Sequence, residues 1–245
     1  MREVSQDTNL ECSTYESCKT SIVQAFKLTL KAGKWILATP YALIIIFAVM
    51  IFDHIIRMVM TLDSQYLRLI HFPEATFGVI GSAISVMGLF APKIALILAE
   101  GCAPTFNLFI TFAFTFIGLL GMTFFIPFAG IVPVSLVFGA YFLMNFFQSY
   151  YLNKITDSTQ RATVLSFKGL SLNAAYGIIG VCYSLFLSLL RSGILESEPG
   201  ISTESLDSQV FIESIAWFPW YFFVMFIILF VFARWWIHDT NQNIG

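Results

Sequence analysis

Asp53, His54 and Arg57 are the residues of this chain whose side-chain types and spacing best support chemistry. They lie inside a long apolar run, where a charged side chain normally faces protein or water rather than lipid. Asp53 and Arg57 are four residues apart, so on a helix they share one face and can neutralise each other. A carboxyl group or an imidazole in such a place can also exchange protons, which makes Asp53 or His54 a candidate for proton coupling.

A second interpretation of Asp53 is purely structural. At a rise of about 1.5 Å per residue, Asp53 lies about 27 Å along a helix that begins at Trp35. That distance places it near one membrane interface, where a charged side chain can reach the head groups without any functional role. A variant distinguishes the two interpretations. If Asp53 lines a substrate cavity, Asp53→Asn should lower uptake while the protein level stays unchanged, whereas normal uptake by the variant would remove Asp53 from the site.

Two further apolar runs carry uncharged polar side chains. Asn145 and Gln148 are three residues apart in one run, and Asn173 and Tyr176 are three apart in the next. Each can line a cavity, or can simply hydrogen-bond to a neighbouring helix. The seven candidates for a substrate cavity are Asp53, His54, Arg57, Asn145, Gln148, Asn173 and Tyr176.

Six apolar runs of about 20 or more residues position these side chains, and each run can span a bilayer. With 58% hydrophobic and 11% charged residues, the chain has too little polar surface for a water-soluble globule. The stretch Tyr41–Phe52 is apolar on every face, which predicts helices rather than a barrel. The six runs extend over Trp35–Leu62, Ala75–Ala99, Pro104–Pro127, Ala129–Leu152, Ala162–Leu190 and Phe211–Trp236.

The sequence therefore predicts an all-α, polytopic membrane protein with six transmembrane helices. Residues 1–34 form a cytosolic linker with a short amphipathic helix from Ser21, residues 35–236 form the membrane domain, and residues 237–245 form a cytosolic tail. Basic residues gather on the side that holds both termini, which is expected to be the cytoplasm at a plasma or inner membrane. They are Lys19, Lys27, Lys31, Lys34, Lys154, Arg161, Lys168 and Arg234.

The third and sixth runs carry most of the phenylalanine and few polar groups, so we expect both to face lipid at the periphery. The other four would then surround a polar interior, the layout of half a transporter built from two three-helix repeats. No residue pattern indicates an enzyme, a cofactor, a metal site or a nucleic-acid partner. The expected partners are the lipid bilayer and a small-molecule substrate.

The connection between the fourth and fifth runs resembles a known family. Tyr151-Leu152-Asn153 ends one run, and Arg161-Ala162-Thr163-Val164-Leu165-Ser166 opens the next after a short polar loop. This pattern is similar to the connection between the tenth and eleventh helices of major facilitator superfamily transporters. Pro40 and the segment Phe72–Gly81 look like parts of the seventh and eighth helices of that family, and the resemblance covers roughly Ser21 to Trp236.

The resemblance implies a twelve-helix secondary carrier that works by alternating access, of which this chain looks like the C-terminal six-helix half. Its partner would be a missing N-terminal half or a second copy. The segment Leu98–Pro104 departs from the family, because it lacks the basic cluster often found there. Arg161 can bond the carbonyls that end the preceding span or pair with Asp157, which makes these two residues candidates for a cytosolic gate. The alternative is a non-transporting assembly module or the remnant of a carrier gene.

Overall fold

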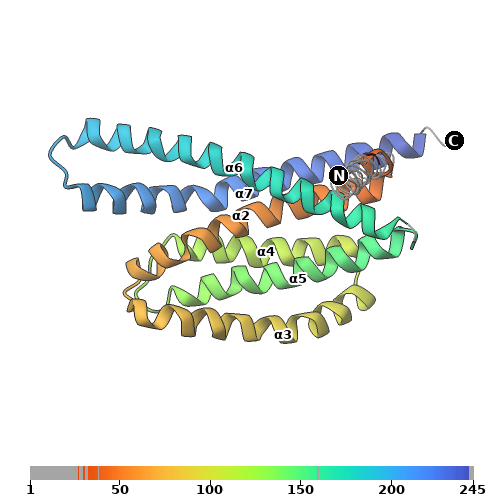
Figure 1. Ribbon diagram of the computed structural model, residues 1–245, viewed down its shortest axis with the longest axis horizontal. Helices are drawn as coiled ribbons and strands as arrows, with labels where there is room; N and C mark the ends of the chain where they lie inside the picture. The colour runs from red at the N-terminus through yellow and green to blue at the C-terminus, as the bar shows by residue number, and fades with distance from the viewer. Residues whose placement is uncertain (1–26, 28–29, 31–32, 38, 159, 243–245) are drawn as a thin grey trace, which may run out of the picture.

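The computed structural model describes residues 27, 30, 33–37, 39–158 and 160–242 (Figure 1). The described part is helical and contains no strand, and six of its helices are long and apolar enough to cross a membrane. These are α2 Pro40–Leu69, α3 Phe77–Gly101, α4 Pro104–Met122, α5 Ile131–Ile155, α6 Arg161–Ser197 and α7 Thr203–Gln242, with the short η1 Glu74–Thr76 before α3. The prediction of an all-α, multi-pass membrane protein with six spans is confirmed.

The helix ends follow local sequence signals. Pro40 and Pro104 each occupy the first turn of a helix, where the missing N–H of proline costs nothing. The helix that begins at Pro40 continues to Leu69, so Asp53 lies about 20 Å from its start and about 24 Å from its end. Asp53 is therefore near the middle of its helix and not near either end.

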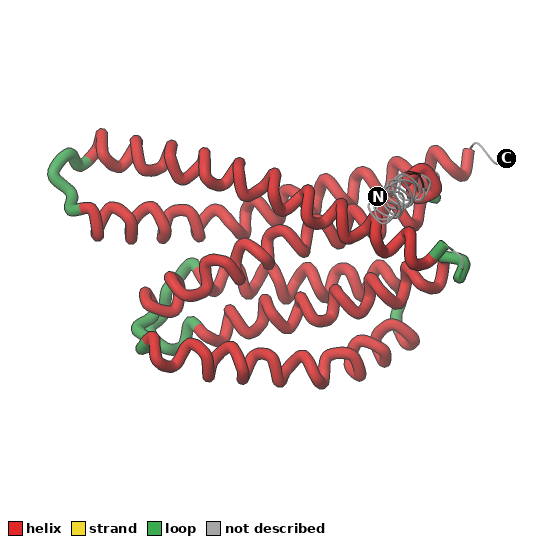
Figure 2. Tube along the Cα trace, viewed as in Figure 1, coloured by secondary structure: helices red, strands yellow, loops and turns green. Residues whose placement is uncertain are grey.

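The structure describes little of the predicted N-terminal linker, and it differs from the prediction at the C-terminal tail. The amphipathic helix expected from Ser21, and most of the linker 1–34, lie outside the described residues. At the other end, α7 continues to Gln242, through much of the stretch assigned to the tail. The loops between helices lie at the two ends of the bundle, as Figure 2 shows. Both described chain ends are at the same end, called here the terminal end.

The central helix of the bundle is α2. It packs against α5, α6 and α7, and it is the most buried of the six spans. Helix α5 packs against α2, α3 and α4, while α4 also packs against α7. By contrast, few residues of α3 are buried, and the most apolar stretch of α6 contains no buried residue. The residues on α2 are therefore the ones best placed to be held by several helices at once.

We expected both phenylalanine-rich spans, α4 and α7, to face lipid at the periphery. That expectation is wrong for one face of each helix, because this face packs against other helices of the bundle. Phe112 of α4 stacks on Phe226 of α7, with ring centroids 3.9 Å apart, and also on Phe222 at 5.4 Å. Phe222 is fully buried, and Phe52 of α2 meets it edge to face at 5.0 Å. The composition of these spans is lipid-like, but offset and edge-to-face ring contacts also join two helices to each other.

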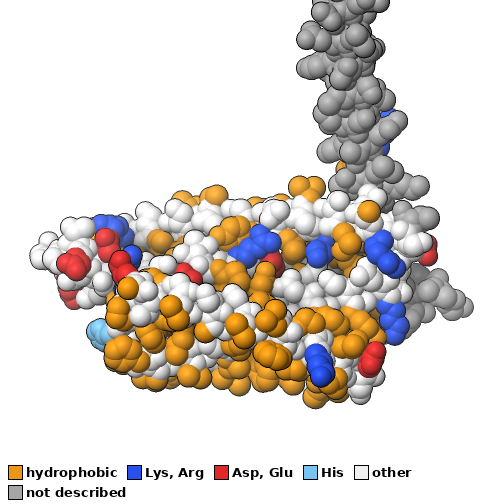
Figure 3. All heavy atoms as spheres, turned by 60° about the horizontal axis from the view of Figure 1, so that its bottom comes forward, with side chains coloured by type: hydrophobic (Ala, Val, Ile, Leu, Met, Phe, Trp, Pro, Cys, Tyr) orange, Lys and Arg blue, Asp and Glu red, His pale blue; other side chains and the backbone are white. Residues whose placement is uncertain are grey.

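Hydrophobic side chains cover much of the molecular surface, as Figure 3 shows for one face. Because lipid tails are as apolar as the side chains themselves, such exposure fits a membrane-embedded surface. Helices α6 and α7 also extend past the other helices at the end opposite the termini (Figure 1). There Arg191 Nη1 lies 2.6 Å from Asp207 Oδ1, in an exposed ion pair that ties the two helices together.

Candidate functional site

The candidate site is a group of polar side chains between the middle of α2 and the adjoining part of α6. Its centre is Arg57, whose Nε lies 2.9 Å from Asp53 Oδ2 and whose Nη1 donates to Asn173 Oδ1 at 2.8 Å. Asp53 is buried, whereas about a third of the Arg57 side chain is exposed. Placing an arginine at the centre of a spanning helix costs about 3 kcal/mol, so these partners are what makes the position tolerable.

The Asp53–Arg57 contact is an ion pair without an aligned hydrogen bond. Asp53 Oδ2 is buried and accepts no hydrogen bond from the described residues, although the Arg57 nitrogen is close. Because a buried carboxylate normally gathers several donors, this oxygen keeps unused capacity to accept one. A small rearrangement of Arg57, or a protonated ligand, could supply it.

Tyr176 closes the site on the α6 side. Its ring lies under the guanidinium of Arg57, 5.6 Å from the charged carbon, which is a cation–π contact. Its hydroxyl lies 2.8 Å from Thr61 Oγ1, and Thr61 Oγ1 in turn donates to the carbonyl of Arg57. Since the one hydroxyl hydrogen of Thr61 is used there, Tyr176 is the donor in the tyrosine–threonine bond.

A second basic group contributes to the charge of the site. Lys168 of α6 is half-buried and close enough to Asp53 for the two charges to interact. The described group therefore contains two basic side chains, Arg57 and Lys168, and one carboxylate, Asp53. A basic side chain at this depth attracts an anion, a partner carboxylate or water rather than lipid tails.

His54 does not join this group, despite its place beside Asp53 in the sequence. Its Nδ1 contacts the carbonyl of Met50 on the same helix, and its Nε2 lies 2.9 Å from the Tyr221 hydroxyl of α7. A carbonyl only accepts, so Nδ1 carries a hydrogen. In the neutral ring Nε2 then accepts from Tyr221. His54 thus joins α2 to α7, which leaves Asp53 as the candidate for proton coupling within the group.

The two polar candidates on α5 also lie apart from the group and from each other. Asn145 is exposed, and its amide donates to the carbonyl of Tyr141 in the preceding turn. Gln148 is buried in a cavity between α2, α4, α5 and α7. Of the seven predicted residues, four therefore come together: Asp53, Arg57, Asn173 and Tyr176.

The predicted gate residues lie at the α5–α6 connection. Arg161 Nη2 donates to the carbonyl of Asn153 in the last turn of α5 at 3.4 Å, which is the helix-end contact expected for it. Asp157 is exposed, and among the described residues its carboxylate forms no ion pair with Arg161. Its backbone carbonyl instead accepts from the Arg161 N–H at 3.1 Å.

Sequence reasoning missed Thr61, and its spacing could have revealed it. Asp53, Arg57 and Thr61 follow one another at four-residue intervals, which places all three on one face of α2. His54 is rotated by about 100° from Asp53, so the same rule separates it from this face. By contrast, no spacing rule relates α2 to Asn173 on α6, since that contact depends on how two distant helices pack.

No metal centre is apparent in the residues that the structure describes, because no three His, Cys, Asp or Glu side chains gather among them. What the site offers instead is a carboxylate, a guanidinium, an amide and a phenol between two helices. Comparisons with family models, with curated proteins and with solved structures find no match for this chain.

Proposed function

We propose that this chain is the C-terminal half of a secondary carrier, which moves a small solute across the membrane by alternating access. The observation that carries the proposal is the partly exposed ion pair of Arg57 and Asp53 in the middle of a spanning helix. Ionisable residues at that depth are rare and typically line a substrate or ion pathway. An ion pair with only a structural role would be more deeply buried, because a charge that is exposed to lipid is costly.

The packing pattern of the helices supports an inverted repeat of three helices. Exchanging α2 with α5, α3 with α6 and α4 with α7 turns most of the main helix–helix contacts into main contacts, although the α6–α7 contact becomes the slight contact between α3 and α4. For example, the α2–α6 contact becomes α5–α3, and α2–α7 becomes α5–α4. Each exchanged pair runs in opposite directions through the membrane, since the second member is the third span after the first. Carriers built from such repeats bind their substrates near the bilayer midplane, at the depth of Arg57.

The open faces of α3 and α6 support a partner unit of similar size. A Cβ atom added at Gly78 or Gly81 of α3, or at Gly177 or Gly180 of α6, would meet no other atom within 4 Å. Small residues on an uncovered helix face allow a second helix to approach closely in a membrane. Asn173 is also exposed on α6, and we propose that a second six-helix unit covers the open faces of α3 and α6 and completes the cavity.

The alternative is an assembly module that transports nothing. It would also use the open faces of α3 and α6, but it has no need for a charged pair at the midplane. The two functions differ in their dependence on Asp53 and Arg57. Removing these charges should abolish transport by a carrier, and should leave the partner interface of an assembly module intact.

The test is uptake of a panel of labelled sugars, organic acids, peptides and lipophilic drugs into cells that produce the protein with its native partners. Asp53→Asn and Arg57→Gln should each reduce uptake at least about tenfold, the effect of losing roughly 1.4 kcal/mol of binding or transition-state stabilisation. The protein level in the membrane should not change. Glu213→Gln is the matched control, because this exposed carboxylate of α7 lies outside the group.

Normal uptake by both variants would remove the pair from the transport pathway. If no solute of the panel accumulates but a second six-helix unit still co-purifies with the chain, the assembly module is supported instead. Because copurification is measured in the same membranes, failure of transport and failure of assembly are distinguished.

A further inference from the structure

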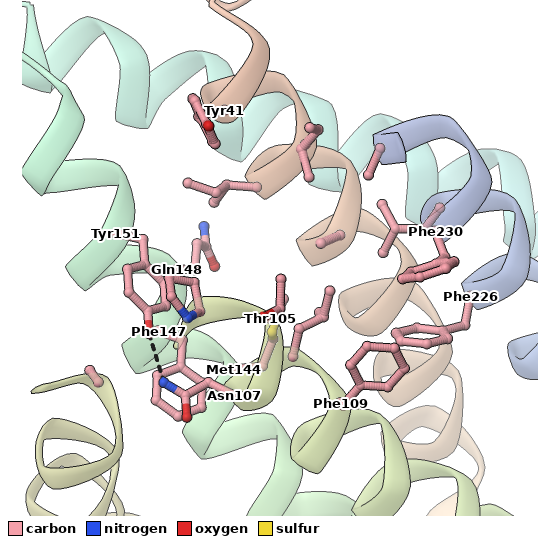
Figure 4. Close-up of a pocket in the computed structure, with 18 of the residues that line it drawn as sticks. Tyr41, Thr105, Asn107, Phe109, Met144, Phe147, Gln148, Tyr151, Phe226 and Phe230 are labelled. Atoms are coloured by element: carbon pink, nitrogen blue, oxygen red, sulfur yellow. Dashed lines mark hydrogen bonds between the residues drawn. The ribbon is translucent and has the colours of Figure 1, made fainter. Parts of the chain in front are cut away.

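A large cavity lies between four helices at the terminal end of the bundle, and it is separate from the Arg57 group. Its volume is about 1410 Å³, and its wall comes mainly from α2, α4, α5 and α7, with Ala99 of α3 at its edge (Figure 4). Typical small-molecule sites measure roughly 300 to 1,000 Å³, so this cavity can hold a larger occupant. Most of the lining is apolar, and it includes Ile44, Ala48 and Met144.

The extent of the cavity matches one half of a membrane. On α5 it runs from Met144 to Ile155, which is about 16 Å along the helix axis. The hydrocarbon core of a bilayer is about 30 Å thick, so one leaflet contributes about 15 Å. The cavity therefore begins at the terminal end and stops near the midplane, as the acyl region of a single leaflet does.

Two buried amides in the cavity have unused hydrogen-bonding capacity. Gln148 is 1% exposed, and neither its Nε2 nor its Oε1 has a partner among the described residues. Asn107 is equally buried; its Nδ2 donates to the Leu98 carbonyl and the Tyr151 hydroxyl, while its Oδ1 has no such partner. Figure 4 shows the Gln148 side chain directed into the space between α2 and α5. Buried polar groups are nearly always satisfied, so both amides point to an occupant with polar atoms.

The terminal end of the cavity is basic and aromatic. Lys154 lies in the last turn of α5 and Arg234 lies in the last part of α7, and both line the cavity. Neither forms an ion pair with a carboxylate of the described residues; Arg234 only contacts the ring of Phe230. Tyr41 and Trp235 border the same end. Lysine, arginine, tyrosine and tryptophan at this position are the residues that meet lipid head groups.

We propose that the cavity binds one anionic phospholipid from the leaflet at the terminal end. Lys154 and Arg234 hold its phosphate, an acyl chain fills the apolar interior, and the Gln148 amide donates to an ester carbonyl. A lipid is favoured over a soluble metabolite because the wall is mostly apolar and the polar groups are confined to one end and to two amides. The ligand lies on the side of α2 opposite Arg57, so the proposal does not depend on transport.

The test is native mass spectrometry of the delipidated full chain, titrated in detergent with dioleoyl phosphatidylglycerol or dioleoyl phosphatidylcholine. One phosphatidylglycerol should bind more tightly than phosphatidylcholine. The double variant Lys154→Gln/Arg234→Gln should weaken phosphatidylglycerol binding on the order of tenfold, since each basic residue adds to the attraction of an anionic lipid. Lys93→Gln is the control, because this exposed lysine of α3 does not line the cavity.

A second variant tests whether the lipid enters the interior. Ala48 is buried on α2 and lines the cavity, so Ala48→Phe should fill part of it and lower the affinity for phosphatidylglycerol by a similar factor. Thermal unfolding of each variant reports whether it has folded, and the charge variant remains decisive if Ala48→Phe does not fold. Equal affinity for the two lipids, an effect of Lys93→Gln as large as that of the double variant, or unchanged binding by folded Ala48→Phe would each overturn the proposal.

Discussion

On the side of α2 that faces α6, Arg57 lies between Asp53 and Asn173, whereas on the side that faces α7, Phe52 packs edge to face on Phe222. The first side is partly exposed and is held by charge and hydrogen bonds. The second is closed and is held by ring contacts. Both sides belong to one helix in one membrane, so the surrounding lipid does not account for the difference.

The difference shows how α2 divides two tasks between its faces. Ring packing on the α7 side requires neither water nor a particular protonation state, and it can hold the helix rigidly. The charged side keeps an under-used carboxylate oxygen and an accessible guanidinium, which a sealed structural pair would not. One face of α2 is thus rigid, and the other carries side chains that can rearrange. This arrangement is expected where a rigid scaffold positions a functional site.

The largest effect on stability is expected on the aromatic side. Phe222→Ala should lower the free energy of unfolding by about 3 kcal/mol, because it leaves a cavity among Phe52, Phe112 and the α7 backbone. Reversible denaturation in mixed micelles measures this change. Phe223→Ala is the matched control, since that neighbouring ring is 39% exposed and its loss should cost well under half as much. Equal losses would mean that the buried face of α7 is not the one that joins the helices.

On the charged side, removing one partner should cost more than removing both. Arg57→Leu leaves the buried Asp53 carboxylate without its counter-charge, and we expect a loss of about 2 kcal/mol, reduced from the fully buried case because Arg57 is partly exposed. Asp53→Leu/Arg57→Leu should recover much of that loss. The double-mutant cycle in the same micelles measures the coupling. Additive losses would show that the pair is not coupled.

The sequence predicted the charged side better than the aromatic side, and the reason is physical. Asp53 and Arg57 pair within one helix, so their spacing alone determines that they meet. The contact of Phe112 with Phe226 joins two helices far apart in the chain, and composition alone does not say which face of a helix meets another. Asn145 and Gln148 show the same limit: although they are three residues apart, Asn145 lies on the exposed surface and Gln148 lines the cavity. Six spans were predictable, because length and hydropathy are local properties.

A smaller effect is expected between the two sides, where His54 joins α2 to α7. Tyr221→Phe removes the hydroxyl that lies 2.9 Å from His54 Nε2 and should cost about 1 kcal/mol of unfolding free energy. Tyr41→Phe is the control, because Tyr41 is exposed and makes no hydrogen bond to the described residues through its hydroxyl. If Tyr221→Phe also lowered uptake while stability was unchanged, His54 would have to be added to the site.

The smallest effect is expected far from both sides, where α6 and α7 extend beyond the bundle. The Arg191–Asp207 pair is exposed, so Arg191→Ala should change the unfolding free energy by about 0.5 kcal/mol or less. At about 1 M salt, where charges are screened beyond about 3 Å, even that difference should vanish. A loss that matched the Asp53–Arg57 coupling and persisted in salt would show that exposure is not what separates the two pairs.

The most direct test of the central claim asks whether water reaches the charged side and not the lipid-facing surface. Thr61→Cys and Asn173→Cys place thiols beside Arg57, and Ile228→Cys places one on the exposed surface of α7. The four native cysteines are first replaced by serine, and each variant is labelled in intact membranes with a membrane-impermeant maleimide. We expect Thr61→Cys and Asn173→Cys to react from at least one side of the membrane, and Ile228→Cys to stay unlabelled. No reaction at either position beside Arg57, with the proteins folded, would contradict a water-accessible cavity at this site.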